Sequence, residues 1–253
     1  MSDFDLSERV AVVTGGNSGI GLGIAQGLGE AGARVMICGR RDAANDAAIE
    51  MLRSAGCDAH SIVVDVTDRD QLSALFTYTR EKFGPVDILV NNAGTARHSA
   101  FLDTEPEDFD LVMGLNVRAA YFAAQAAARR MAEAGIAGSI INISSQMGHV
   151  GGPERALYCA SKHAMEGFTK AMAIDLAGTG IRANTLCPTF IETPMTAPFF
   201  EKPAFREFVK ASIPRGTVGT LEELMGAVVF LASDASTLFT GSALMADGGW
   251  TAR

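Results

Sequence analysis

The chain has 253 residues, of which 48% are hydrophobic and 20% are charged, and its formal net charge is -8 at pH 7. This composition is typical of a globular protein with a large apolar core, and it excludes the intrinsically disordered class. An acidic chain without a lysine- or arginine-rich patch is poorly suited to bind nucleic acid or an anionic membrane. We therefore expect neither of these partners.

The pattern along the chain predicts one domain over residues 1–253, because no Pro/Ser-rich linker or charge run divides it. Its apolar stretches are short and interrupted. The first residues, Met1–Glu8, are acidic where a signal peptide would be basic and then apolar. These features predict a cytoplasmic protein.

The four cysteines, Cys38, Cys57, Cys159 and Cys187, lie in otherwise apolar segments and show no Cys-x-x-Cys spacing. Free, buried thiols are the expected state. Cys159 and His163 have the i, i+4 spacing of two ligands on one helix face, but a pair alone makes no metal site. Packing is the favoured role for this pair, and we predict no catalytic metal.

Short β-like runs alternate with amphipathic helical patterns along the chain. Near-continuous apolar runs such as Ile140–Ile143 are typical of strands covered on both faces. Their alternation with helices predicts a doubly wound parallel sheet of about seven strands between two helix layers, a three-layer α/β sandwich of the Rossmann type. The predicted strands are Val10–Thr14, Arg34–Cys38, His60–Val64, Ile88–Val90, Ser139–Ile143, Arg182–Leu186 and Ser242–Met245.

A glycine-rich turn, Thr14-Gly-Gly-Asn-Ser-Gly-Ile-Gly21, follows the first predicted strand and opens a helical pattern. Gly15, Gly19 and Gly21 can take a positive φ or allow a close approach of the backbone. A pyrophosphate could then lie at the helix N-terminus, where free N–H groups and the helix dipole favour an anion. The alternative is an ordinary tight connection between a strand and a helix.

The second predicted strand ends at Cys38-Gly39-Arg40-Arg41. In a dinucleotide-binding fold an acidic residue at this place binds the ribose 2'-hydroxyl, whereas an arginine favours a 2'-phosphate. Gly39 removes the carboxylate, and Arg40 can bind a phosphate through two parallel hydrogen bonds. NADP(H) is the favoured cofactor. The alternative is that Arg40 and Arg41 are ordinary surface residues and that NAD(H) also binds.

Tyr158 and Lys162 are spaced i, i+4, and Ser145 stands thirteen residues before the tyrosine. A tyrosine pKa of about 10 must fall to near 7 for acid catalysis at neutral pH, which requires roughly 4 kcal/mol of preferential stabilisation of the phenolate. An ammonium about 4 Å away supplies about 4 kcal/mol at an effective dielectric near 20. One helix face carries both side chains, so the spacing suits proton transfer. Alone, such a pair is more often a solvated surface pair.

A long connection over residues 188–214 carries several prolines and phenylalanines, among them Phe190, Phe199, Phe205 and Phe208. A long apolar segment after the carboxyl end of a strand is where an α/β sheet places a lid or a substrate wall. The alternative is a packing or oligomer contact.

At this point the sequence resembles the short-chain dehydrogenase/reductase family over almost its whole length. The motifs that carry the resemblance are Thr14 to Gly21, Asp65-Val66, Asn91-Asn-Ala-Gly94, Asn116, Ile143-Ser-Ser145, Tyr158 to Lys162 and Asp247-Gly-Gly249. The resemblance implies a nicotinamide dinucleotide cofactor, a catalytic tetrad of Asn116, Ser145, Tyr158 and Lys162, and a homotetramer. One departure is Pro188-Thr189, where the family usually has Pro-Gly.

The tetrad residues have distinct roles by this resemblance. Tyr158 exchanges a proton with the substrate oxygen, Ser145 polarises that oxygen, Lys162 lowers the Tyr158 pKa and holds the ribose, and Asn116 holds a water that links Lys162 to solvent. Asp65 would meet the adenine amino group. The implied cofactor contacts are Gly15, Asn17, Ser18, Gly19, Ile20, Gly21, Arg40, Arg41, Asp65, Val66, Asn92, Ala93, Gly94, Tyr158, Lys162, Pro188, Ile191, Thr193 and Met195.

Substrate-binding candidates mix polar groups with an apolar wall. The residues predicted to contact substrate are Ser145, Met147, His149 and Phe190, and further candidates for the pocket are Arg97, His98, Gln146, Glu154, Arg155 and Phe199. A lone histidine in a loop, such as His149, is more often an incidental surface residue. The set suits a small-molecule polyol, keto-sugar or cyclic ketone.

The predicted function is therefore an NAD(P)(H)-dependent interconversion of a secondary alcohol and a ketone. One alternative is a reductase of 3-oxoacyl groups on an acyl carrier protein, although Thr179 stands where such relatives place a basic residue. A second is a non-catalytic NADP(H)-binding sensor, which the intact tetrad disfavours. A third is an epimerase or dehydratase, whose relatives typically have an added substrate domain.

Overall fold

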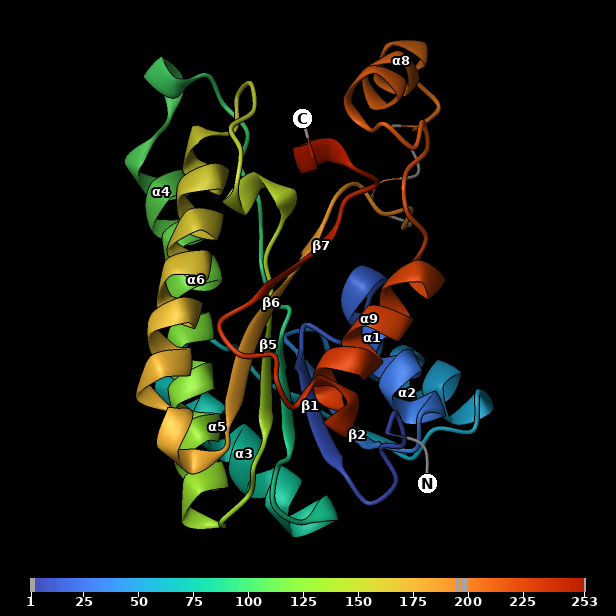
Figure 1. Cartoon of the computed structure of the whole chain (residues 1–253), viewed down its shortest axis with the longest axis vertical. Coiled ribbons are helices and arrows are strands. Elements are labelled where there is room, and N and C mark those ends of the chain that lie inside the picture. The colour runs from blue at the N-terminus through green and yellow to red at the C-terminus, as the bar shows by residue number, and fades with distance from the viewer. Residues whose placement is uncertain (1–2, 194–195, 197–199, 253) are drawn as a thin grey trace.

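The computed structural model describes residues 3–193, 196 and 200–252. Its centre is a parallel sheet with the strand order β3-β2-β1-β4-β5-β6-β7, flanked by helices on both faces (Figure 1). The predicted doubly wound α/β fold is confirmed. The strands are β1 Val10–Thr14, β2 Arg34–Gly39, β3 Ala59–Val63, β4 Ile88–Asn91, β5 Ser139–Ile143, β6 Arg182–Pro188 and β7 Ala243–Ala246.

The strand ends differ from the sequence-based bounds by at most two residues. The largest difference is in β6, which runs to Pro188 because its register with β7 continues through Pro188 and Ala246. Proline lacks an N–H, but at the last position of a strand its carbonyl still accepts a hydrogen bond. Thr189 N then donates to Ala246 O at 3.2 Å. The pairing of β6 with β7 therefore reaches Thr189, the residue that stands where the family usually has glycine.

Helices cover both faces of the sheet because alternate side chains of each strand point to opposite sides. In β1, Ala11 and Val13 join the core under α1, α2 and α9, whereas Val10 and Val12 join the core under α3, α5 and α6. The helices are α1 Gly19–Glu30, α2 Asp42–Ser54, α3 Arg69–Phe83, α4 Pro106–Met113, α5 Ala120–Glu133, α6 Ala156–Asp175, α8 Pro203–Ser212 and α9 Leu221–Ala232. None of the helices in the described part of the chain is long and apolar enough to cross a bilayer.

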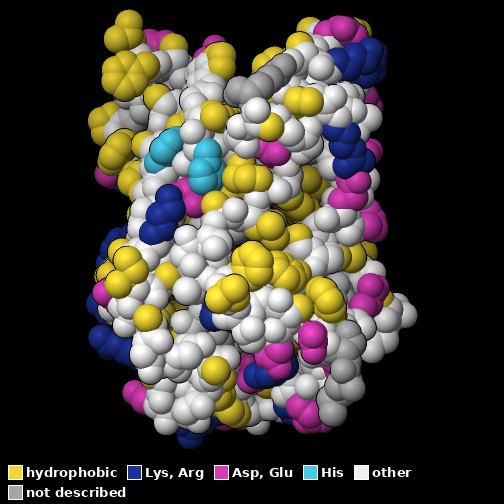
Figure 2. All heavy atoms as spheres, in the orientation of Figure 1, with side chains coloured by type: hydrophobic (Ala, Val, Ile, Leu, Met, Phe, Trp, Pro, Cys, Tyr) yellow, Lys and Arg dark blue, Asp and Glu magenta, His cyan; other side chains and the backbone are white. Residues whose placement is uncertain are grey.

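The described part of the segment after β6 includes a helix. It contains the ten-residue helix α8, which Figure 1 shows beyond the carboxyl end of the sheet, near the C-terminal end of the chain. Phe190 packs edge-on against Phe205, with ring centres 5.2 Å apart. The ring centre of Trp250 lies 5.9 Å from that of Phe190. Figure 2 shows the surface notched at this end, between the part that contains α8 and the part that contains α4. The predicted contact at Met195 and the candidate Phe199 lie outside the described residues.

Candidate active site

The turn between β1 and α1 is held by the neighbouring end of β4. Asn92 Nδ2 donates to Thr14 O at 3.0 Å and to Gly15 O at 3.1 Å, and the Thr14 hydroxyl accepts hydrogen bonds from Asn92 N and Ala93 N. Gly15 and Gly19 have φ values of +63° and +53°, which glycine adopts without strain. The turn is therefore preformed where the order of strands reverses between β1 and β4, which is where ligands bind in this class of sheet.

Gly21 is the turn residue with the least room, because a Cβ there would overlap Gly15 O and Asn92 Nδ2. Gly21→Ala is expected to lower the free energy of unfolding by about 1–3 kcal/mol, as overpacking does, and to weaken NADPH binding. Urea unfolding and a fluorescence titration with NADPH measure both effects. The matched control is Gly226→Ala in α9, where a Cβ meets open space. Wild-type affinity for NADPH in Gly21→Ala would contradict this reading of the turn.

A cleft of about 700 Å³ opens along the carboxyl ends of β1, β2 and β4. Most of the cofactor contacts implied by the sequence line it, including the glycine turn, Arg40, Asp65 and Ile191. Tyr158, Lys162 and Pro188 are not among its lining residues, and Phe190, predicted as a substrate contact, is one of them. Lining residues that are not among the predicted cofactor or substrate contacts are Cys38, Gly39, Val64, Leu115, Thr189 and Thr196.

The mouth of the cleft at β2 suits a 2'-phosphate. The Arg40 side chain is 72% exposed, and its guanidinium lies 4.0 Å from Asp65 Oδ2. Asp65 Oδ1 accepts hydrogen bonds from the backbone N–H and the hydroxyl of Thr67. Gly39 has no carboxylate to repel a phosphate, and the Asn17 side chain occupies the space that a Cβ at this position would take. The donor set therefore fits a phosphate at this end of a dinucleotide.

Ser145, Tyr158 and Lys162 meet beyond the carboxyl end of β5. The Ser145 hydroxyl accepts from Met147 N at 3.1 Å and donates to Gln146 Oε1 at 2.7 Å. Lys162 Nζ donates to Ile143 O at 2.8 Å and lies 5.7 Å from the centre of the Tyr158 ring. The i, i+4 spacing on α6 therefore puts the ammonium against the tyrosine, as the sequence suggests.

The pKa of Tyr158 is shifted in the opposite direction from the one expected from the sequence. Burial raises the pKa of Tyr158 above its usual value, and a hydrogen bond with Ser145 and the charge of Arg155 offset this only in part. Burial also lowers the pKa of Lys162 to about 8. The arithmetic assumed an ammonium about 4 Å away in a surface-like medium, whereas the Lys162 ammonium is buried and directed to a backbone carbonyl. In this geometry desolvation is the larger effect on Tyr158.

Asn116 is a buried connector. Its side chain is 0% exposed, which rules out a helix-surface amide. Oδ1 accepts from Thr95 N at 2.8 Å, while Nδ2 donates to Thr95 O at 2.9 Å and to Ser161 Oγ at 3.1 Å. The residue lies in a short π-helical segment, Gly114–Ala119, between α4 and α5, and such local widening of a helix frequently marks a functional site. Asn116 thereby joins the loop after β4 to the helix that carries Tyr158 and Lys162.

Two of the further candidates for the substrate pocket, His98 and Arg155, lie near Tyr158. The His98 ring lies edge-on to Tyr158, with ring centres 6.4 Å apart, and burial together with the Arg155 charge lowers its pKa. Arg155 acts on the tyrosine through its charge. Met147 is buried, and its sulfur lies 3.9 Å from the sulfur of Cys159. The His149 ring faces Glu166 and Cys187, with Nε2 3.5 Å from Glu166 Oε1.

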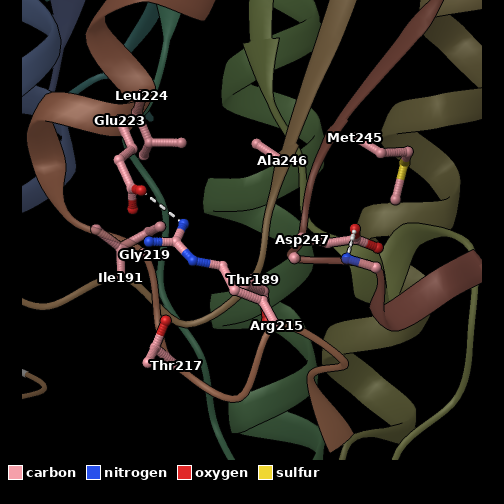
Figure 3. A pocket seen from close by; sticks show the side chains of 12 residues that line it. Thr189, Ile191, Arg215, Thr217, Gly219, Glu223, Leu224, Met245, Ala246 and Asp247 are labelled. Carbon is pink, nitrogen blue, oxygen red and sulfur yellow. Dashed lines mark hydrogen bonds and ion pairs between the residues drawn. The ribbon is translucent and has the colours of Figure 1, made fainter.

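A second cavity of about 300 Å³ adjoins the cleft and shares Thr189 and Ile191 with it (Figure 3). The ion pair between Arg215 Nη1 and Glu223 Oε1, 2.6 Å apart, forms part of its wall. Asp247 on the opposite side accepts a hydrogen bond from Gly249 N at 2.9 Å. The terminal Asp-Gly-Gly motif therefore supports the loop beside the cleft.

The comparisons with known proteins agree with this geometry. A family model described as enoyl-(acyl carrier protein) reductase matches residues 15–251. Gluconate 5-dehydrogenase of Gluconobacter oxydans is 39% identical over 248 residues, which cover 98% of this chain and 96% of that protein. The 2-(R)-hydroxypropyl-CoM dehydrogenase of Xanthobacter autotrophicus is 41% identical over 255 residues, covering 96% of this chain and 99% of that protein.

A solved structure extends the likeness to the backbone. The gluconate 5-dehydrogenase from Burkholderia cenocepacia, in complex with NADP and tartrate, matches with a TM-score of 0.94 and 38% identity, covering 99% of this chain and 98% of that one. The matches run along nearly the whole chain and include the glycine turn and the Tyr158-x-x-x-Lys162 helix. The protein therefore belongs to the short-chain dehydrogenase/reductase family.

Proposed function

We propose that the protein interconverts a secondary alcohol and a ketone of a small polar molecule, using NADP(H). The observation that carries this proposal is the meeting of Ser145, Tyr158 and Lys162 beside a dinucleotide-sized cleft. The bound nicotinamide would supply or accept the hydride. The NADP in the Burkholderia neighbour and the named dehydrogenases among the relatives support the assignment.

The side chains of this chain supply the proton and the orientation. The Tyr158 hydroxyl gives its proton to the ketone oxygen as the carbonyl carbon receives hydride, and takes the proton back in the oxidation direction. The Ser145 hydroxyl donates a hydrogen bond to the same oxygen as negative charge develops on it. Lys162 stays largely protonated at neutral pH with a pKa of about 8, and its ammonium favours the phenolate.

The surroundings of Tyr158 favour a polyol, keto-sugar or sugar acid. Arg155 brings a cationic donor close to the tyrosine, and His98 brings a ring nitrogen. A guanidinium pairs well with a carboxylate, and an imidazole can bond a hydroxyl. Two of the similar proteins are named for gluconate as substrate, which is a polyhydroxy acid.

A substrate panel tests this function. NADPH oxidation is measured with keto-sugars and keto-acids of sugars, cyclic ketones, simple diketones and 3-oxoacyl thioesters. We expect kcat/KM to be highest for a polyhydroxylated ketone, and at least about ten-fold above the thioesters, which corresponds to about 1.4 kcal/mol of differential transition-state binding. Preference for a thioester would support the acyl-carrier alternative. No turnover of any ketone would favour the non-catalytic sensor.

The homotetramer and the cytoplasmic location stay predictions. Large apolar side chains are exposed on the outer helices, including Tyr121 on α5 and Ile174 on α6. They support association between subunits through α5 and α6. The single domain with a lid over residues 188–214 is likewise retained as part of this proposal, with α8 as the body of the lid.

A further inference from the structure

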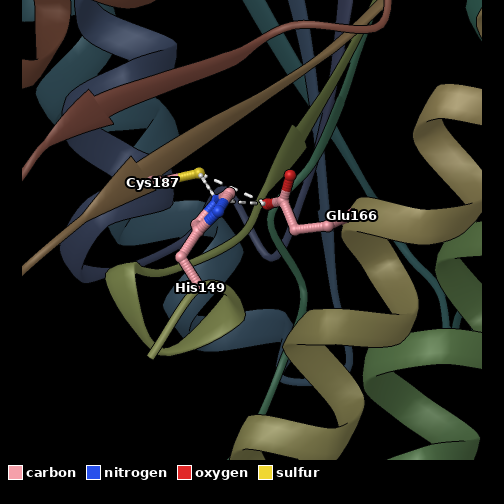
Figure 4. Close-up of side chains that lie close together, drawn as sticks. All are labelled: His149, Glu166 and Cys187. Carbon is pink, nitrogen blue, oxygen red and sulfur yellow. Dashed lines mark hydrogen bonds and ion pairs between the residues drawn. The ribbon is translucent and has the colours of Figure 1, made fainter. Parts of the chain in front are cut away.

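Three side chains with metal-binding atoms meet beside the end of β6. One of them, His149, is a substrate contact predicted from the sequence, and the proposed proton transfer uses none of the three. His149 follows the short turn Gln146–Gly148, Glu166 lies on α6, and Cys187 lies on β6 (Figure 4). Their atoms face one another: His149 Nε2 is 3.5 Å from Glu166 Oε1 and 3.5 Å from Cys187 Sγ, and Cys187 Sγ is 3.3 Å from Glu166 Oε1.

These separations match the edges of a tetrahedral zinc site. Zinc binds sulfur at about 2.3 Å, imidazole nitrogen at about 2.0–2.1 Å and carboxylate oxygen at about 2.0–2.2 Å. In a tetrahedron, ligand atoms at those bond lengths stand about 3.3–3.6 Å apart. The three observed separations, 3.5, 3.5 and 3.3 Å, fall in that interval. The backbone therefore already holds the three donors in a suitable arrangement.

The groups around the three donors orient them. The Thr185 hydroxyl donates to Glu166 Oε2 at 2.9 Å and leaves Oε1 directed to the histidine and the thiol. Such hydrogen bonds to a ligating carboxylate tune a metal site. Ser144 is 3% exposed, and its hydroxyl makes no hydrogen bond of good geometry within the described residues.

We propose that His149, Glu166 and Cys187 bind one Zn²⁺ ion, with water as the fourth ligand. The His149 side chain is 27% exposed and provides the path for the ion and the water, whereas the other two are buried. The mixed sulfur, nitrogen and oxygen donor set suits zinc and disfavours Mg²⁺ and Ca²⁺, which prefer oxygen alone.

Charge balance supports the proposal. Without an ion, the Cys187 thiol donates to Glu166 Oε1, and the buried Glu166 carboxylate also interacts with the charge of Lys162. Zinc deprotonates a coordinating thiol, so binding releases the thiol proton to solvent. The Zn²⁺ charge is then neutralised by one thiolate and one carboxylate.

The test uses the full chain without a histidine tag, treated with a chelator and dialysed. Elemental analysis after Zn²⁺ addition and gel filtration is expected to find one zinc per chain, with about one proton released per ion at neutral pH. Co²⁺ in place of Zn²⁺ is expected to give a thiolate-to-cobalt charge-transfer band and the visible bands of a tetrahedral site. Cys187→Ser and His149→Gln are expected to weaken binding by more than about 100-fold, the upper end of what outer-shell changes cost.

The matched control is the double variant Cys159→Ser/His163→Gln, which removes one cysteine and one histidine from α6 but none of the three donors. It is expected to keep one zinc per chain. The proposal is overturned if the wild type retains no stoichiometric zinc, if the control loses zinc as Cys187→Ser does, or if the cobalt spectrum lacks the thiolate band. Thermal unfolding with chelator present shows whether each variant is folded. If Cys187→Ser does not fold, His149→Gln, at a partly exposed position, decides the outcome. These readouts do not depend on turnover.

Discussion

Tyr158→Phe is expected to lower the rate of ketone reduction by NADPH by about 10²–10⁴-fold, the range that a positioned general acid supplies. The change removes one hydroxyl and leaves the ring in place against His98 and under Lys162. The affinity for NADPH is expected to change little, because the cleft is lined by the glycine turn and the ends of β2 and β4 rather than by this residue.

Single-turnover reduction with excess enzyme measures the chemical step, and a fluorescence titration measures NADPH affinity. The matched control is Tyr121→Phe, the same loss of a hydroxyl from an exposed ring on α5. A Tyr158→Phe enzyme that keeps most of the wild-type rate, on a substrate that the wild type reduces, would show that another group donates the proton. An equal loss of rate in both variants would indicate that removing a tyrosine hydroxyl lowers the stability of the protein, not that Tyr158 donates the proton.

The way in which Tyr158 becomes a usable acid is more demanding than its spacing from Lys162 suggests. The buried ammonium donates to Ile143 O, and desolvation raises the tyrosine pKa. A phenol with a raised pKa donates readily to a developing alkoxide but resists ionisation beforehand.

The sheet could be predicted because its signals are local. Apolar runs such as Ile140–Ile143 and the turn glycines Gly15 and Gly19 carry their structural meaning within a few residues. Strand bounds were therefore right to within two residues. The cleft residues could be predicted for a related reason, since the carboxyl ends of parallel strands lie together at one edge of the sheet.

Features that depend on contacts distant in sequence could not be predicted. Asn116 reads as a helix residue flanked by apolar neighbours, and only the folded chain shows its bonds to Thr95 and Ser161, 21 and 45 residues away. His149 faces Cys187, which lies 38 residues later in the chain, and no periodic pattern in the sequence indicates this contact. The prolines and phenylalanines of residues 188–214 predict an irregular connection, whereas Pro203 begins helix α8, because proline is well tolerated in the first turn of a helix.

Arg40→Ala is expected to lower kcat/KM for NADPH by about 10–100-fold, since a hydrogen bond to a charged group contributes about 1.5–3 kcal/mol, and to leave kcat/KM for NADH nearly unchanged. The guanidinium is exposed at the mouth of the cleft, and Asp65, its ion-pair partner within the described residues, is 4.0 Å away. The side chain is therefore available to a 2'-phosphate, and its loss does not disturb the core.

Steady-state kinetics with both cofactors measure the ratio of the two kcat/KM values, and Arg129→Ala on α5 controls for the change in net charge. Arg40→Lys distinguishes charge from geometry, because an ammonium keeps the attraction but cannot form two parallel bonds to a phosphate. An intermediate NADPH preference in Arg40→Lys would show that both contribute. Comparable kcat/KM for NADH and NADPH in the wild type would instead remove Arg40 as the determinant.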